Sequence, residues 1–310
     1  MRKWVKILIL ILLLAGGAVL CAIRWQAWFG MPDEPRWNGE TSDYVFSPIE
    51  ADETPQSLDV LVLGDIHSKL THADYDTLAA RVPQADMVVQ VGDWLERGQN
   101  YYYQLLLREW ETSQLFGLPV IAAPGNHEYT KGLNRHLSPI WQNAFSHPDN
   151  GPVDVPGSSY YVDIEQVRFI VIDTNPLDRL VYLTRTLTWL ETLQKEAQDR
   201  YVVVLMHHPV LSAGKGRIHP LIYSTFRYAL GKADLVLAGH DHSYMRRGHF
   251  VVLNTAGKPK PQRTHLRAEV TDSVSAYGVL SIYNEPSSLQ FNVYRLEDHA
   301  LIDSLYVSHD

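Results

Sequence analysis

The sequence contains almost no cysteine. Cys21 is the single thiol among 310 residues, so no disulfide can form within one chain. A zinc site built from several thiolates is excluded for the same reason. Scarcity of cysteine suits an oxidising compartment, although many cytosolic proteins share it.

The sequence also lacks an excess of positive charge and any internal repeat. Its 27 Lys and Arg residues against 35 Asp and Glu residues give a formal net charge of −8. Broad nucleic-acid binding needs a basic face that neutralises phosphates, so we expect no nucleic-acid partner. With 45% hydrophobic residues, the chain can bury a large core.

One long apolar run stands near the N-terminus, from Ile7 to Ile23. It exceeds the ~7–15 residues of a signal-peptide core and reaches the ~17–25 residues that span a bilayer. Three positive charges precede the run and one follows it, a pattern that keeps the N-terminus cytoplasmic.

We therefore expect residues 1–28 to anchor the chain in a membrane, with the rest of the chain on the periplasmic or extracellular side. A cleaved signal segment and a secreted protein are the alternative. Residues 29–57 hold several prolines and acids without periodicity, which indicates a linker. No interior linker follows, so residues 58–310 are expected to form one domain.

Short apolar runs alternate with helical patterns in the first half of this domain, as is typical of a largely parallel α/β sheet. The predicted strands are 58–65, 85–93 and 118–126, and the predicted helices between them are 73–81 and 101–116.

The second half predicts another sheet, partly antiparallel. Two strands within 159–175, a helix over 184–199 and strands over 201–209 and 233–242 come first. Then 276–296 predicts a hairpin that turns at 284–288, and 300–308 a third strand beside it.

Acidic, amide and imidazole side chains stand where five of the predicted strands end. They occur in the motifs GDIH, GDWLERG, GNHE, MHHP and GHDH, and they are Asp65, His67, Asp93, Asn126, His127, His207, His208, His240 and His242. Loops beyond the carboxyl ends of parallel strands are where open α/β sheets bind ligands. A glycine directly before a candidate ligand in four motifs permits a sharp turn.

Carboxylate, imidazole and amide oxygen together suit Mn, Zn or Fe. The set exceeds what one ion needs, and two ions sharing a carboxylate would use it fully. In GHDH, strand alternation would place His240 and His242 on one side and Asp241 opposite. In MHHP, the same alternation would turn one histidine away, so His208 is as readily structural as functional.

Together these motifs resemble the signature of the calcineurin-like metallophosphoesterase superfamily over about residues 58–246. The resemblance implies two packed mixed β-sheets flanked by helices (an α-β-β-α fold), with a dinuclear metal centre at one edge. By the same resemblance, the first ion takes Asp65, His67 and His242, the second takes Asn126, His207 and His240, and Asp93 bridges both. His127 then meets the phosphate and helps the leaving group depart.

Within the superfamily, GNHEY and GHDHSYMR look most like the purple acid phosphatase branch. Members of that branch carry a metal-binding Tyr at the position of Glu96. The iron–tyrosinate that colours them is therefore not expected, and a plain ion pair between Glu96 and Arg97 is an alternative role for this carboxylate.

The resemblance predicts hydrolysis of small phosphate monoesters by a metal-bridging hydroxide, with Asp93 and His127 as the catalytic residues. A phosphodiesterase acting on cyclic nucleotides, nucleotide sugars or lipid headgroups is the nearest alternative, and a non-catalytic scaffold a remote one. Asn126 and His127 are expected to contact the substrate. Arg217 and His219, in the loop 212–220, either join them or belong to a solvated loop.

Overall fold

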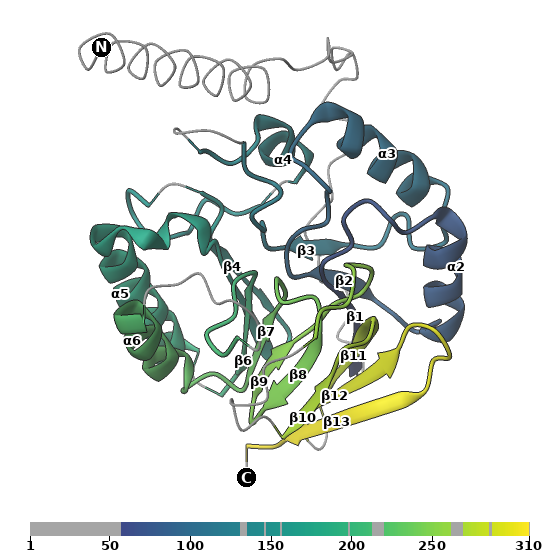
Figure 1. The fold of residues 1–310 in the computed structure, drawn as a ribbon. Helices are drawn as coiled ribbons and strands as arrows, with labels where there is room; N and C mark the ends of the chain where they lie inside the picture. The colour runs from purple at the N-terminus through teal and green to yellow at the C-terminus, as the bar shows by residue number, and fades with distance from the viewer. Residues whose placement is uncertain are drawn as a thin grey trace, which may run out of the picture.

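Two β-sheets pack face to face in this computed structural model, with helices on their outer faces (Figure 1). The structure describes residues 57–309, apart from 131–134, 146, 156, 198, 213–219, 262–268 and 285–286. The expected membrane segment 1–28 and nearly all of the expected linker lie outside the described residues, so the predicted anchor and its sidedness stay predictions. No helix within the described part combines the length and the hydropathy needed to cross a bilayer.

The first sheet joins the two ends of the described chain. Its strand order is β13-β12-β11-β1-β2-β3. β1 (Ser57–Leu63), β2 (Met87–Gln90) and β3 (Val120–Ala122) run parallel. β11 (Ala276–Tyr283), β12 (Ser288–Arg295) and β13 (Leu301–Val307) continue the sheet antiparallel beyond β1.

The second sheet has the order β10-β8-β9-β7-β6-β5-β4. β5 (Val167–Ile172), β6 (Tyr201–Met206), β7 (Leu235–Ala238) and β9 (Phe250–Val252) are parallel. β4 (Tyr160–Ile164), β8 (Tyr244–Arg247) and β10 (Val270–Asp272) pair antiparallel to their neighbours.

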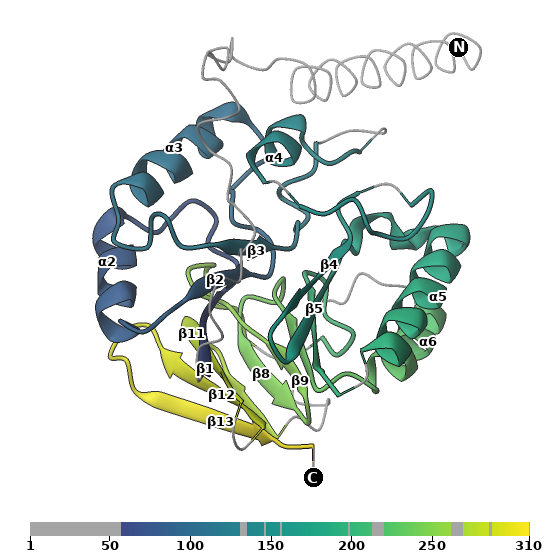
Figure 2. The ribbon, with the colours of Figure 1, turned by 180° about the vertical axis from the view of Figure 1, so that it is seen from behind.

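Helices cover the outer face of each sheet, as both views show (Figures 1 and 2). α2 (His72–Arg81), α3 (Asn100–Glu111) and the short α4 (Pro139–Ala144) lie on the first sheet. The 3₁₀ turn η2 (Asn175–Asp178), α5 (Leu180–Glu196) and α6 (Pro220–Leu230) lie on the second.

Strand alternation explains why the sheets are covered on both faces. In β1, Val60 and Val62 enter the core shared with the second sheet, whereas Leu61 and Leu63 pack beneath the helices. A continuous apolar run is what a strand buried on both faces requires. The predicted architecture of two mixed sheets flanked by helices is confirmed.

The predicted strands are too long at their C-terminal ends. β1 ends at Leu63, β2 at Gln90 and β7 at Ala238, each before the polar motif that the prediction included in the strand. The reason is local: Asp65, Asp93 and other motif residues have positive φ, which a β-strand cannot contain.

One buried hydroxyl links the two sheets close to these motifs. Tyr160 of β4 donates a hydrogen bond from its Oη to the carbonyl oxygen of Ala122 (3.1 Å) and accepts one from the amide of the same residue (3.1 Å). Ala122 lies on β3, an edge strand of the first sheet. Tyr160 bonds the side of β3 that no described strand pairs with.

Replacing Tyr160 with Phe should lower the free energy of unfolding by about 1–3 kcal/mol, because it leaves a buried amide and carbonyl without a partner. Chemical denaturation of both proteins measures the difference. Tyr161→Phe is the matched control. Tyr161 is the next residue of β4, and its ring packs on the guanidinium of Arg168 in β5. An equal loss in the two variants would contradict the role assigned to the Tyr160 hydroxyl.

Candidate metal centre

The polar motifs at the ends of β1, β2, β3, β6 and β7 meet at one edge of the two packed sheets. Donor atoms of Asp65, His67, Asp93 and His242 all lie within 4.8 Å of one another, as do those of His207, His208 and His240. The first three strands belong to one sheet and the last two to the other. The site is therefore shared between the sheets.

In the first group, two imidazoles face two carboxylates. The Nε2 atoms of His67 and His242 are 3.0 Å apart. His67 Nε2 lies 3.9 Å from Asp65 Oδ1 and 3.8 Å from Asp93 Oδ2, and His242 Nε2 lies 3.8 Å from Asp65 Oδ1. Four donor atoms thus point at a common position.

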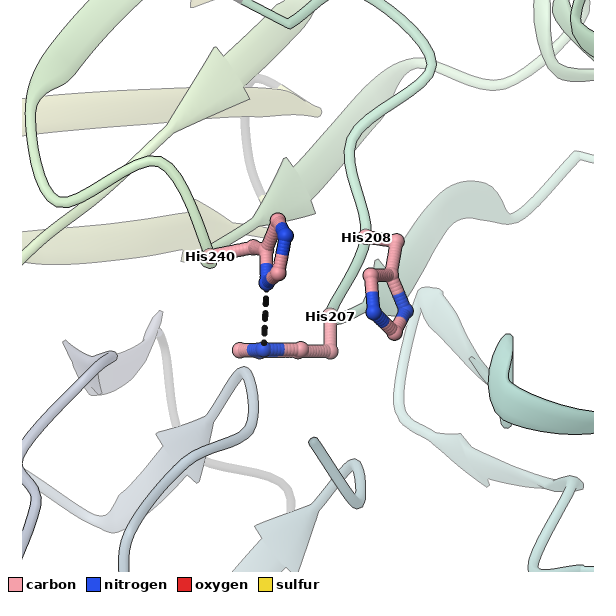
Figure 3. Close-up of side chains that lie close together, drawn as sticks. All are labelled: His207, His208 and His240. Carbon is pink, nitrogen blue, oxygen red and sulfur yellow. Dashed lines mark hydrogen bonds between the residues drawn. The ribbon is translucent and has the colours of Figure 1, made fainter. Parts of the chain in front are cut away.

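The second group is formed by histidines that follow β6 and β7 (Figure 3). His240 Nδ1 is 3.3 Å from His207 Nε2. Asp93 Oδ2 lies 3.2 Å from the same His207 Nε2 and so stands between the two groups. Asn126, the remaining predicted ligand, has a buried Oδ1 that accepts no hydrogen bond.

His208 does not turn away from the site, so the alternation predicted for MHHP is wrong. Its ring centroid is 4.5 Å from that of His240, and Thr174 Oγ1 lies 2.7 Å from its Nδ1. The reason is that β6 ends at Met206, before either histidine, so strand alternation no longer applies.

The GHDH motif reaches the expected arrangement by a different backbone. His242 lies in the first group and His240 in the second, while Asp241 accepts a hydrogen bond from Ser212 Oγ at 2.9 Å. Both histidines have positive φ, 73° for His240 and 54° for His242. A sharp turn, and not an extended strand, presents them.

Strained backbone is concentrated at the predicted ligands. Asp65, His67 and Asp93 also have φ between 50° and 54°. Residues other than glycine adopt this left-handed conformation at a cost of ~1–3 kcal/mol each, and such strain gathers at functional sites. Five of the seven predicted ligands therefore adopt a backbone conformation that is locally unfavourable but places their side chains at the site.

Two glycines are required by close approach. A Cβ on Gly125 would come within 2.2 Å of Asp93 Oδ1, and one on Gly92 within 2.4 Å of His207 Nδ1. Gly92 in addition has a φ of 93°. The absence of a side chain at these two positions lets the backbone lie directly against His207 and Asp93.

Backbone carbonyls fix the orientation of two imidazoles. His207 Nδ1 donates to the carbonyl of Val91 (3.1 Å), and His242 Nδ1 donates to the carbonyl of Lys258 (3.2 Å). Each bond leaves Nε2 directed at its group. Carbonyl partners of this kind commonly orient metal-binding histidines.

Burial sets the charge of the first group. It lowers the pKa of His67 to about 3 and that of His242 to about 4, so both imidazoles are neutral and offer a lone pair. Asp65 is fully buried, neither carboxylate oxygen accepts a hydrogen bond, and burial raises its pKa.

Asp93 and His207 hold opposite charges. Burial alone would raise the pKa of Asp93, but the charge and hydrogen bond of His207 outweigh it and lower that pKa. Burial alone would lower the pKa of His207, but Asp93 raises it to about 9. In the metal-free protein Asp93 and His207 therefore form a buried ion pair, and His207 must lose a proton before its Nε2 can bind an ion.

These observations show that the residues fit metal ions. Asp65 is a fully buried carboxyl group with no hydrogen-bond partner among the described residues, so its charged form carries a large desolvation penalty unless a cation compensates it. The set of oxygen and imidazole donors, with no thiolate, suits two borderline divalent ions.

One buried carboxylate in GNHE has a role that the sequence reasoning missed. Glu128 accepts hydrogen bonds from the amides of Asp93 (2.9 Å), Leu95 (2.9 Å) and Gly125 (2.7 Å). Burial, reinforced by the charge of Asp93, raises its pKa to about 7. Glu128 ties the loop after β2 to the loop after β3. The signal was the acidic residue of GNHE itself.

His127 stands at the accessible side of the site. Its amide donates to Asp93 Oδ1 (2.9 Å), and its Nδ1 donates to the carbonyl of Glu96 (2.5 Å). Its Nε2 lies 3.8 Å from Asp93 Oδ2, and the side chain is 33% exposed. An imidazole held in this way can exchange a proton with a molecule at the site.

Glu96 faces the site and not Arg97. Its carboxylate lies 3.5 Å from His67 Nδ1, and within the described residues no ion pair joins it to Arg97. The remaining predicted substrate contacts, Arg217 and His219, fall in 213–219 and lie outside the described residues.

The family model of the calcineurin-like phosphoesterases matches residues 58–244, more than half of the chain. The chain belongs to the calcineurin-like phosphoesterase family. The match covers every motif that supplies a residue to the site.

The chain is also similar in sequence to three curated proteins. "Glycerophosphodiester phosphodiesterase GpdQ" of Enterobacter lignolyticus is 27% identical over 169 residues, 51% of this chain and 56% of that protein. "Probable glycerophosphodiester phosphodiesterase GpdQ" of Arcobacter nitrofigilis is 25% identical over 236 residues, 73% of this chain and 79% of that protein. "Purple acid phosphatase 3" of Arabidopsis thaliana is 22% identical over 211 residues, 49% of this chain and 56% of that protein.

Among solved structures, the purple acid phosphatase PPD1 from yellow lupin (Lupinus luteus) seeds has the same fold. It matches with a TM-score of 0.62 and 14% identity, over 85% of this chain and 55% of that one. The family and the names of the two phosphodiesterase relatives support a metal-dependent phosphoric ester hydrolase.

The buried carboxylate of Asp65 gives a test of metal binding that needs no substrate. In the full chain with saturating Mn²⁺ or Zn²⁺, the melting temperature should rise by roughly 5 °C or more, because the ions bind only the folded state. In Asp65→Asn the metal-free protein should melt no lower than wild type, since the amide has the size of the carboxyl group and burial disfavours a carboxylate there, and the metal-dependent rise should largely disappear.

Asp59→Asn is the control, since Asp59 lies on β1 itself and bonds Ser281 away from the site. It should keep the metal-dependent rise in melting temperature. A full rise in Asp65→Asn would show that Asp65 holds no ion.

Proposed function

We propose that this domain hydrolyses phosphodiesters at a dinuclear metal site. The observation that carries the proposal is the position of Asp93, whose Oδ2 lies 3.8 Å from His67 Nε2 in one group and 3.2 Å from His207 Nε2 in the other. In the proposed assignment the first ion takes Asp65, His67 and His242, the second takes Asn126, His207 and His240, and Asp93 is shared.

The preference for diesters is supported by the two relatives that are named as glycerophosphodiester phosphodiesterases. Monoester hydrolysis, the expectation from the motifs, is the second candidate. The GNHEY and GHDHSYMR segments and the match to purple acid phosphatase 3 favour it.

When bound, the two ions would lower the pKa of a water molecule and offset the charge of the phosphate. The chain's own residues supply orientation and a proton. The Val91 and Lys258 carbonyls hold two imidazoles in place. The Glu96 carbonyl accepts a hydrogen bond from the Nδ1–H of His127, which leaves Nε2 facing the site. Nε2 takes up a proton from solvent, and the resulting imidazolium gives that proton to the departing oxygen. General acid catalysis of this kind contributes about 10²–10⁴-fold.

Parallel assays with p-nitrophenyl phosphate and bis-p-nitrophenyl phosphate should decide between the candidates. With added Mn²⁺ or Zn²⁺, we expect the diester to have the higher kcat/KM. Asp93→Ala should lose both ions and both activities, because it removes the shared ligand. A higher kcat/KM for the monoester would favour the second candidate, and no turnover of either ester across metals and pH would favour a non-catalytic scaffold.

His127→Ala should retain the metal content of wild type but slow hydrolysis by about 10²–10⁴-fold for esters with poor leaving groups. Good leaving groups need no proton, so their hydrolysis should fall much less. The measurement is kcat across a series of aryl and alkyl diesters. His72→Ala, an exposed histidine at the start of α2, is the control. Equal slowing across the series would argue against an acid role.

A further inference from the structure

Asp173 is a fully buried carboxylate that belongs to neither metal group. It directly follows β5 and lies in the second sheet's half of the molecule. Its Oδ2 accepts hydrogen bonds from Tyr129 Oη (2.5 Å) and the Ser158 amide (3.1 Å). Its Oδ1 accepts from the amide and the Nδ2 of Asn175, both at 3.0 Å. In contrast to Asp65, Asp173 is saturated by donors.

The donors on Asp173 hold both ends of the GNHE motif. Asn175 Nδ2 donates a second bond to the carbonyl of Gly125 (3.2 Å), at the start of the motif. Tyr129 is the residue directly after its end. Through these donors, a single carboxylate in the loop after β5 holds both ends of the short segment that carries Asn126 and His127.

The opposite side of this segment is held by the site itself. Glu128 accepts the amide of Gly125, and the amide of His127 donates to Asp93 Oδ1. These contacts involve neither Asp173 nor the side chains that donate to it. The hydrogen bonds that link Asp173 to this segment can thus be removed by mutation without removing any predicted metal ligand.

We propose that Asp173, acting through Tyr129 and Asn175, is a positioning residue that sets where Asn126 and His127 stand relative to the rest of the site. The proposal rests on the proposed function. Asp173 acts at a distance from the substrate, because its oxygens are occupied by the donors that it orients.

The hydrogen bonds to Asp173 would affect the reaction rate by fixing the position of His127 relative to the substrate. A displacement of the reacting groups by about 1 Å, caused by a change far from the chemistry, can cost roughly a hundredfold in rate. His127 Nε2 must meet the leaving oxygen, whereas the bulk of substrate binding does not depend on it. Loosening the segment should therefore lower kcat and leave KM nearly unchanged.

The test uses the full chain and two variants, each of which removes the hydrogen bond at one end of the GNHE segment. Tyr129→Phe removes only the hydroxyl that bonds Asp173, and Asn175→Ala removes the bond to Gly125. Ser158→Ala is the matched control. It loses the contact of its Oγ with His147 but keeps the amide that donates to Asp173.

Hydrogen–deuterium exchange of the metal-free proteins gives a readout independent of activity. We expect exchange of peptides covering 125–129 to rise at least severalfold in Tyr129→Phe and Asn175→Ala, with β5 and β6 unchanged. In the metal-loaded proteins, kcat should fall roughly tenfold to a hundredfold at constant KM and constant metal stoichiometry. Ser158→Ala should match wild type in every measurement.

Wild-type exchange over 125–129 together with wild-type kcat in both variants would overturn the proposal. Faster exchange throughout the domain, or a rise in KM equal to the fall in kcat, would also overturn it, because Asp173 would then serve stability or binding alone. If wild type hydrolyses neither ester, the proposed function fails. The exchange over 125–129 then still decides whether Asp173 holds this segment.

Discussion

The site is organised around a carboxyl group, Asp65, that is buried without a compensating charge or hydrogen bond among the described residues. Asp65 lies wholly inside the protein with both carboxylate oxygens unbonded, and Asp93 lies beside it between two groups of imidazoles. Such an arrangement is unfavourable in a metal-free protein and becomes favourable when cations are bound. Strand ends with left-handed backbone and glycines in close contact serve to keep these carboxylates where they are.

Much of the architecture was predictable from periodicity. Apolar runs marked the parallel strands, and the rule that ligands gather beyond the carboxyl ends of such strands brought together motifs that are far apart in sequence. Strand boundaries were less accurate, because Asp65 and Asp93 depart from extended backbone, and their residue type permits a positive φ without requiring it. The helices α4 and α6 and the short strands β8, β9 and β10 were not predicted at all.

The parts of the site that sequence could not supply are single residues whose partners lie far along the chain. Glu128 bonds amides of the loop after β2, and Asp173 bonds the side chain of Tyr129. No local pattern encodes either contact. The prediction for His208 was wrong for another reason. Strand alternation was assumed to continue past Met206, where β6 ends. The roles of individual ligands came from the family resemblance and not from spacing.

Under the proposed assignment, neither ion has a complete set of ligands on one sheet. Three of the contributing strands belong to the first sheet and two to the second, and the two sheets meet only when their shared core has formed. Metal uptake would then be a late event in maturation, after the two sheets have docked. The ions available at the moment when the sheets dock would decide which metals the protein carries.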